Sequence, residues 1–168
     1  NSSLRYYLIA QLAGISKIYQ YPLFQKKRQH ITETPRIFFQ NKLGLNVQED
    51  PEIQIDEETI NQSIKKFNIE KDEINILLGI GGSGPTKRIP ADTFLNVIDK
   101  MLQIRKCKFF LATGKSEEEQ KILNELLQSR FNKYLVPMDN LSIKETLPII
   151  KICNFSVCND SSFSHLSA

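Results

Sequence analysis

A glycine-rich segment carries the strongest chemical signal in this sequence. Residues 79–88 read Gly-Ile-Gly-Gly-Ser-Gly-Pro-Thr-Lys-Arg and directly follow an apolar run that favours a buried strand. Glycine lets a backbone approach a ligand closely, so these amides, the Ser83 hydroxyl and the Lys87 ammonium could surround a diphosphate. Lys87 would then stabilise a departing anionic group. A surface turn with a solvated Lys87 is the alternative that this segment alone leaves open.

The same segment matches the Gly-x-Gly-x-x-Gly pattern of dinucleotide-binding proteins over residues 79–84. That pattern expects its third glycine inside a starting helix, whereas here Pro85 follows and the next helix is expected only after Pro90. It also expects an acid after the second strand, where residues 112–114 read Ala-Thr-Gly. An NAD(P)-dependent oxidoreductase is therefore kept only as an alternative. A nucleoside-triphosphatase P-loop is not expected, because Lys87 does not directly follow the closing glycine.

A second polar segment, residues 159–168, follows another apolar strand and is expected to open a helix. It reads Asn-Asp-Ser-Ser-Phe-Ser-His-Leu-Ser-Ala. The first turn of a helix presents unpaired amides and a partial positive charge, which suit a phosphate. Asp160 or Ser161 acting only as a helix cap, with His165 as a packed helix residue, is the alternative.

Regular strand and helix patterns are expected to position these two segments. Strands are predicted over 74–78, 108–112, 134–136 and 155–158, with a helix after Pro90 and capping boxes at Ser116 with Glu119 and at Ser142 with Glu145. Such alternation predicts an α/β fold, a Rossmann-like parallel sheet with helices on both faces. Ligands of these sheets bind beyond the carboxyl ends of the strands, where both polar segments fall.

The residues before the sheet follow a different pattern. Helices are predicted over 2–12 and 37–45, and a polar, acidic connection leads to a helix capped by Asp56. We therefore expect two domains, the end of one over 1–56 and a second over 57–168. A start at Asn1 and an end at Ala168 favour a segment of a longer protein, with the second domain truncated. A processed mature chain is the alternative.

Composition narrows the functional classes. The 168 residues are 40% hydrophobic and 24% charged with a net charge of +3, as in ordinary globular proteins. The short basic run at 26–28 is too small for a nucleic-acid footprint, so a solvated loop or contact with an anionic membrane surface is expected instead. Three cysteines without CxxC spacing indicate neither a disulfide framework nor a zinc site. No apolar stretch reaches the roughly 18 residues of a membrane helix, and a cytoplasmic protein is expected.

Together these motifs resemble glycosyltransferase family 9, the heptosyltransferase type of bacterial lipopolysaccharide assembly. The resemblance rests on Ser83 to Pro90, on Thr113-Gly114 with Glu117 and Glu118, on Leu141-Ser142, and on Asn159-Asp160-Ser161 with Ser164-His165-Leu166. It covers residues 74–168 clearly and Leu12-Ala13-Gly14-Ile15 faintly.

The resemblance implies a GT-B fold, with a C-terminal nucleotide-sugar domain and the tail of an N-terminal acceptor domain. It implies an inverting, metal-independent transferase without a cofactor, moving heptose from ADP-heptose to a glycolipid or oligosaccharide acceptor of the lipopolysaccharide type. Such an enzyme would be cytoplasmic, with peripheral contact at the inner membrane surface as an option. The catalytic base would precede Asn1, so this segment alone is expected to be inactive. A non-catalytic nucleotide-binding module remains a further alternative.

The resemblance also assigns roles to individual side chains. It implies Ser83 and Lys87 for the diphosphate, Glu117 or Glu118 for the ribose, Leu141 for the base, and Asp160, Ser161, Ser162 and His165 for the sugar and phosphates. Ser162 stands where the family commonly has glycine, and its side chain could crowd the diphosphate or add a hydrogen bond. The resemblance therefore indicates the class of donor, a nucleotide sugar, more firmly than it indicates which nucleotide sugar is used.

Overall fold

The computed structural model describes residues 4–20, 33–47, 52–82, 84 and 88–168. The chain divides into two compact units, Asn1–Ile53 and Gln54–Ala168. Ser83 and Lys87 lie outside the described residues. Within the described part of the chain, no helix is both long and apolar enough to cross a membrane.

The first unit contains two helices, α1 (Leu4–Leu12) and α2 (Glu33–Leu43), and neither buries a residue fully. Glycines with positive φ follow both helices, Gly14 at 77° and Gly44 at 67°, as the sequence predicted. The predicted start of the second helix at 37 was wrong, because α2 begins at Glu33. Pro35 falls in its first turn, where a missing N–H leaves no intrahelical bond unmade.

The second unit is a parallel α/β sheet, as predicted. In chain order its elements are α3 (Glu57–Lys66), β1 (Ile74–Gly79), α4 (Ala91–Ile104), β2 (Cys107–Ala112), α5 (Glu117–Leu127), a 3₁₀ turn (Asn132–Tyr134), β3 (Leu135–Pro137), α6 (Ile143–Ile152), β4 (Phe155–Cys158) and α7 (Ser162–Leu166). The four strands pair in the order β3-β2-β1-β4, and every pair is parallel. Each strand lies within one residue of its predicted bounds.

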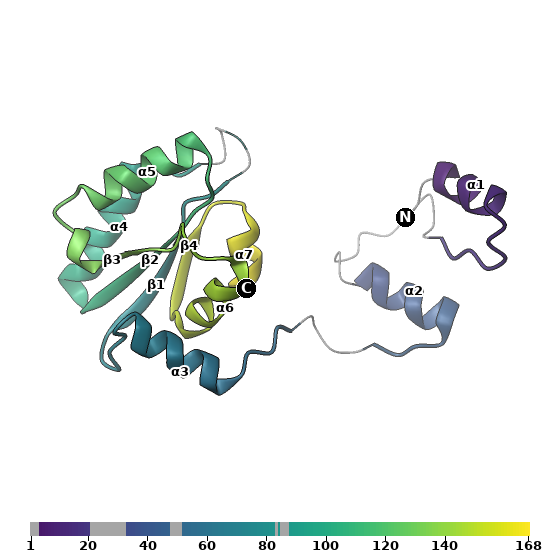
Figure 1. The fold of residues 1–168 in the computed structure, drawn as a ribbon, viewed down its shortest axis with the longest axis horizontal. Coiled ribbons are helices and arrows are strands. Elements are labelled where there is room, and N and C mark those ends of the chain that lie inside the picture. The colour runs from purple at the N-terminus through teal and green to yellow at the C-terminus, as the bar shows by residue number, and fades with distance from the viewer. Residues whose placement is uncertain (1–3, 21–32, 48–51, 83, 85–87) are drawn as a thin grey trace. The chain divides into compact units, whose positions relative to one another are not determined.

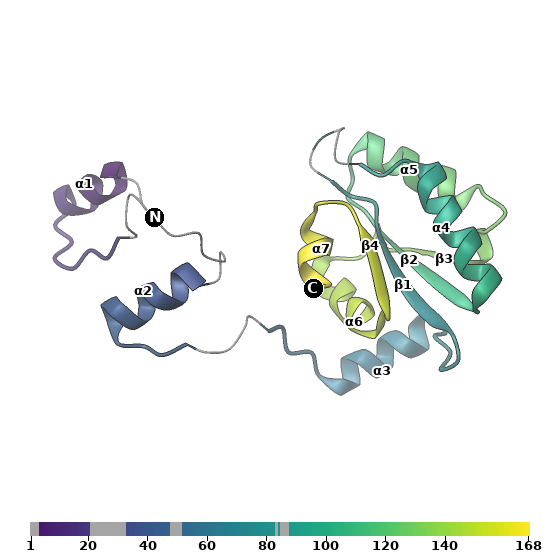
Figure 2. The same ribbon diagram turned by 180° about the vertical axis from the view of Figure 1, so that it is seen from behind.

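Helices cover both faces of this sheet (Figures 1 and 2). One core cluster joins Phe94 of α4 and Leu126 of α5 to Ile76 and neighbouring strand residues. The opposite cluster joins Ile149 of α6 to Leu77, and Phe67 at the end of α3 packs against it. Successive strand residues thus point to opposite faces, and both faces are apolar because both are covered.

The observed helix caps match the predicted ones except at α5, and this exception matters for function. Asp56 caps α3 by accepting the Thr59 amide at 2.8 Å. Ser142 and Glu145 form a reciprocal capping box at α6, as predicted. Ser116 does cap α5, but the expected return contact from Glu119 is absent. The Glu119 side chain turns toward the glycine-rich segment instead.

Candidate functional site

A cavity of about 550 Å³ lies at the carboxyl ends of β1, β2 and β4. From β1 the chain builds the sheet outward through β2 and β3, then returns to place β4 on the other side of β1. The connections beside β1 therefore leave toward opposite faces of the sheet, which opens a crevice at this point. The volume is that of an ordinary small-molecule site.

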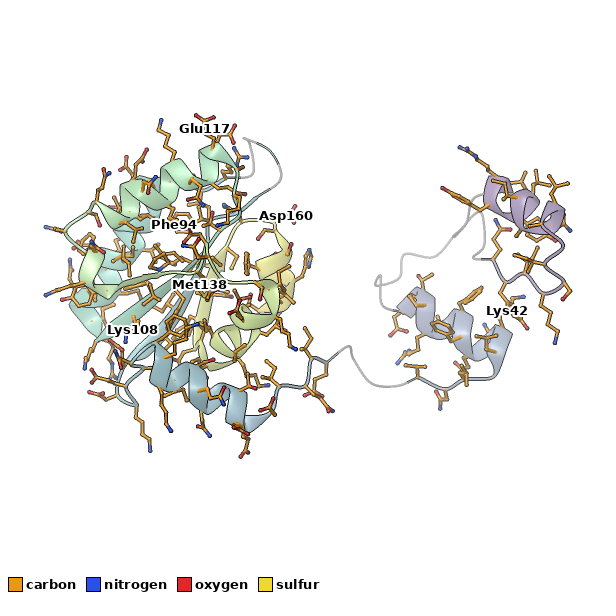
Figure 3. The ribbon with its side chains drawn as sticks, in the orientation of Figure 1. Lys42, Phe94, Lys108, Glu117, Met138 and Asp160 are labelled. Carbon is orange, nitrogen blue, oxygen red and sulfur yellow. The ribbon has the colours of Figure 1, made fainter. Side chains whose placement is uncertain are left out.

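Three loops line this cavity. Gly81 and Gly82 follow β1, Gly114 lies in the β2–α5 connection with Glu119 in the first turn of α5, and the largest share follows β4, namely Asp160, Ser161, Ser162, Phe163 and His165. The two polar segments singled out in the sequence therefore meet at one site, together with a third loop. Figure 3 shows Asp160 between β4 and α7, at the same end of the sheet as Glu117.

Glu119 forms the floor of the site between two glycines. The residue is 9% exposed, and its Oε1 accepts a hydrogen bond from the Gly82 amide at 3.1 Å. A Cβ added at Gly114 would lie 2.5 Å from Oε2, and one at Gly81 would lie 3.3 Å from Oε1. The absence of side chains at both glycines therefore leaves room for the carboxylate.

Gly79 is the last residue of β1, where β1 pairs with β4 just before the residues that line the cavity. A Cβ at this position would lie 2.7 Å from Sγ of Cys158 and 2.8 Å from its Cβ. Both distances are below van der Waals contact, so only glycine lets the two strand ends approach this closely. The close approach brings the segments that follow β1 and β4 together.

The segment after β4 presents hydroxyls and an imidazole. Ser161 Oγ is buried and makes no hydrogen bond among the described residues. The neighbouring Ser164 hydroxyl donates to the Ser161 carbonyl at 2.7 Å, which fixes the first turn of α7. Asp160, Ser162 and His165 are exposed to the cavity side and to solvent. A ligand oxygen could satisfy the Ser161 hydroxyl without displacing an internal partner.

Other residues predicted to contact a ligand lie outside the cavity lining. Glu117 and Glu118 are exposed in the first turn of α5, and Glu118 Oε2 lies 4.0 Å from the Arg88 guanidinium. Leu141 packs against the core cluster that contains Met138. Of the three consecutive acids on α5, the structure brings only Glu119 into the cavity. The sequence reasoning missed it because Glu119 was assigned to a capping box.

Burial favours the thiol form of the two cysteines just before and at the end of β4. Burial raises the pKa of Cys153 to about 12, and burial also raises the pKa of Cys158. All three cysteines are free, and Cys107 is buried. Within the described ranges, no group of three or more His, Cys, Asp and Glu side chains is placed to hold a metal ion.

Comparison with known proteins decides the family. A family model described as glycosyltransferase family 9 (heptosyltransferase) matches residues 10–168, nearly the whole chain. The chain belongs to glycosyltransferase family 9. No curated protein sequence matches it significantly.

Solved structures give the same fold for this family 9 chain. ADP-heptose lipopolysaccharide heptosyltransferase II of E. coli superposes with a TM-score of 0.64 at 17% identity, over 99% of this chain and 57% of its own. A family 9 glycosyltransferase from Veillonella parvula superposes with a TM-score of 0.68 at 19% identity, over 85% of this chain and 41% of its own. E. coli heptosyltransferase WaaC, solved with ADP-2-deoxy-2-fluoro heptose, superposes with a TM-score of 0.61 at 19% identity. The match covers 93% of this chain and 46% of the WaaC chain.

These matches confirm the predicted GT-B type of α/β fold. The chain spans about half the length of the heptosyltransferases that it resembles. The described sheet thus makes up part of the fold that those enzymes share.

Proposed function

We propose that this family 9 chain is the donor-binding part of a glycosyltransferase that moves a sugar, heptose, from an ADP-sugar to a lipopolysaccharide-type acceptor. The observation that carries the proposal is the cavity at the ends of β1 and β4, where the glycine-rich backbone meets serine hydroxyls and His165. Hydroxyls and an imidazole can donate hydrogen bonds to the oxygens of a nucleotide diphosphate, and glycines leave room for it. Structures of WaaC with ADP and with an ADP-heptose analogue support the choice of donor.

Within this proposal the diphosphate lies between the glycine-rich segment and the residues after β4. The Ser161 hydroxyl and the His165 ring bind phosphate or sugar oxygens, and Asp160 binds sugar hydroxyls. Lys87 neutralises the charge that develops on the departing ADP, which is the role its position in the sequence motif implies. Arg88, only 18% exposed and beside Glu118, adds a cation at the edge of the site.

The carboxylate that binds the ribose comes from the start of α5. The family resemblance favours Glu117 or Glu118, whereas the geometry favours Glu119, since it alone of the three lines the cavity. Leu141 remains the proposed contact for the base. It lies in the connection between β3 and α6, where it packs against the core.

The remaining features of the reaction come from the family resemblance. We propose inverting, metal-independent transfer without a cofactor, a base supplied by the acceptor domain, and a glycolipid or oligosaccharide acceptor. We place the reaction on the cytoplasmic side, with peripheral contact at the inner membrane. The oxidoreductase alternative gains no support, because the family match points elsewhere and α4 begins only at Ala91, well after Gly84.

Calorimetric titration with ADP, ADP-heptose, UDP-glucose and NAD tests the proposal. We expect saturable binding of ADP and ADP-heptose that is weakened by Lys87→Ala and Asp160→Ala. Lys121→Ala, an exposed lysine on α5 away from the cavity, is the matched control. Preferred binding of NAD, or ADP binding that none of the site substitutions alters, would overturn it.

A further inference from the structure

One buried side-chain amide connects two of the segments that line the cavity, those that follow β1 and β4. Asn159 is 3% exposed and directly follows β4. Its Nδ2 donates to the Ile80 carbonyl at 2.5 Å, and its Oδ1 accepts from the Ile89 amide at 2.8 Å. Its own amide donates to the Gly79 carbonyl at 3.0 Å. A single side chain therefore bonds to the backbone on both sides of the glycine-rich segment.

The two bonded residues lie at opposite ends of that segment. Ile80 is fully buried at the end of β1, and Ile89 comes just before Pro90 and the start of α4. With both ends bonded to one planar amide, their separation is fixed, and so is their position relative to Asp160, which is the next residue in the chain. Among the described residues, the Asn159 side chain is the hydrogen-bond acceptor for the Ile89 N–H.

We infer that Asn159 is a positioning residue for donor binding, which holds the glycine-rich segment in register with the residues after β4. This inference rests on the proposed function, since the ligand it serves is the ADP-sugar. A loop whose ends, at Ile80 and Ile89, are already held in place loses less conformational freedom when a ligand binds, so this anchoring raises the affinity. Asn159 itself contacts backbone, with its polar atoms engaged, and is not assigned a contact to the ligand.

The chain offers two controls. Asn154 precedes β4 and bonds at the opposite end of the same strand, where its Oδ1 accepts the Asn75 amide at 2.9 Å and its own amide donates to the Asn75 carbonyl at 2.7 Å. It matches Asn159 in residue type and bonding pattern. Asn75 is 6% exposed and matches Asn159 in burial. Both lie at the end of the sheet away from the cavity.

The experiment measures ADP affinity and amide hydrogen exchange in Asn159→Ala, Asn154→Ala and Asn75→Ala. We expect Asn159→Ala to weaken ADP binding at least about tenfold and to speed exchange at the Ile89 amide, while the controls stay within about threefold of wild type in affinity. Asn159→Asp keeps the shape of the side chain but lacks the donor to Ile80. Asn159→Asp should show a similar loss of ADP affinity. It replaces Asn159→Ala in the test if the alanine variant does not fold.

The outcomes separate the two proposals. Equal loss of ADP affinity in Asn159→Ala and the controls, or unchanged exchange at Ile89, would overturn the positioning role. Faster exchange at Ile89 with unchanged ADP affinity would overturn it as well. If the wild-type protein binds no ADP, the proposed function fails, and exchange at Ile89 alone then decides whether Asn159 holds the segment.

Discussion

Glu119 Oε1 lies 3.1 Å from the amide nitrogen of Gly82, so a buried carboxylate in the first turn of α5 bonds to the loop that follows β1. Carboxylates accept strong hydrogen bonds from backbone amides, and burial keeps water from competing for this one. The contact fixes Gly82 in a position where its neighbours in the sequence can meet a ligand. It also places a negative charge at the floor of the site.

Removing this carboxylate should weaken donor binding. We expect Glu119→Ala to raise the Kd for ADP about tenfold, which corresponds to about 1.4 kcal/mol, because Gly82 loses its partner. Glu119→Gln retains an acceptor oxygen and should stay within about threefold of wild type. Calorimetric titration measures both.

The matched control is Glu125→Ala, an exposed acid on the same helix. Its ADP affinity should equal that of the wild type. Glu117→Ala and Glu118→Ala, measured beside it, test the ribose contact that the family resemblance implies. A larger effect at either of these than at Glu119 would contradict the assignment from geometry.

Gly114 should be coupled to Glu119. An alanine Cβ at 114 would lie 2.5 Å from Oε2, the end of a flexible side chain, so we expect the carboxylate to move while the backbone holds. Gly114→Ala should therefore weaken ADP binding several-fold with little change in urea stability. In a Glu119→Ala background the same substitution should have no further effect. Additive effects in the double variant would show that Gly114 acts independently of Glu119.

Gly79 should matter for stability. Its replacement by alanine forces a Cβ against Sγ and Cβ of Cys158, and we expect urea unfolding to show a loss of about 1–3 kcal/mol. Cys158→Gly removes both clashing atoms, so the double variant Gly79→Ala/Cys158→Gly should lose less than the sum of the single changes. Cys158→Ala keeps the Cβ at 2.8 Å and should rescue less. Equal rescue by both would contradict this account.

The capping box of α6 should make stability depend on pH. Hydrogen bonds from the Ser142 amide, at 2.8 Å, and from its hydroxyl lower the pKa of Glu145 below its ordinary value of 4.5. The unfolded state therefore binds the proton more tightly, and the contribution of the box is present above pH 4.5 and lost as pH falls below it.

Unfolding experiments between pH 6 and pH 3 check this sign. The stability of the wild type should fall relative to that of Glu145→Gln as the pH is lowered, because only the wild type loses a carboxylate. Ser142→Ala should reduce the difference, since it removes the hydroxyl partner. A difference between wild type and Glu145→Gln that does not change over this range would contradict the prediction.

Much of the second unit could be predicted from sequence because local and long-range signals agree there. The strands are mainly apolar, and Asp56, Ser116 and Ser142 mark helix starts by their hydrogen-bonding chemistry. The first unit was harder, because the helix predicted from residue 37 begins at Glu33 and holds Pro35 in its first turn, which tolerates proline.

The site was only partly predictable, because its geometry depends on contacts between distant residues. The rule that ligands bind beyond strand ends led to two of the segments that line the cavity. It could not tell that Glu119 bonds to Gly82 across 37 positions instead of closing its own capping box. The pair Ser116 and Glu119 has the same spacing as Ser142 and Glu145, so only the fold distinguishes them.

The strand β4 lies at an edge of the sheet among the described residues, and its outer side has a further consequence. Only β1 pairs with this strand, and Phe155 at its start is 59% exposed. The outward amides and carbonyls of an edge strand are a template for another strand. A strand added beside β4 would therefore pair with the segment that leads directly into Asn159 and the lining of the cavity.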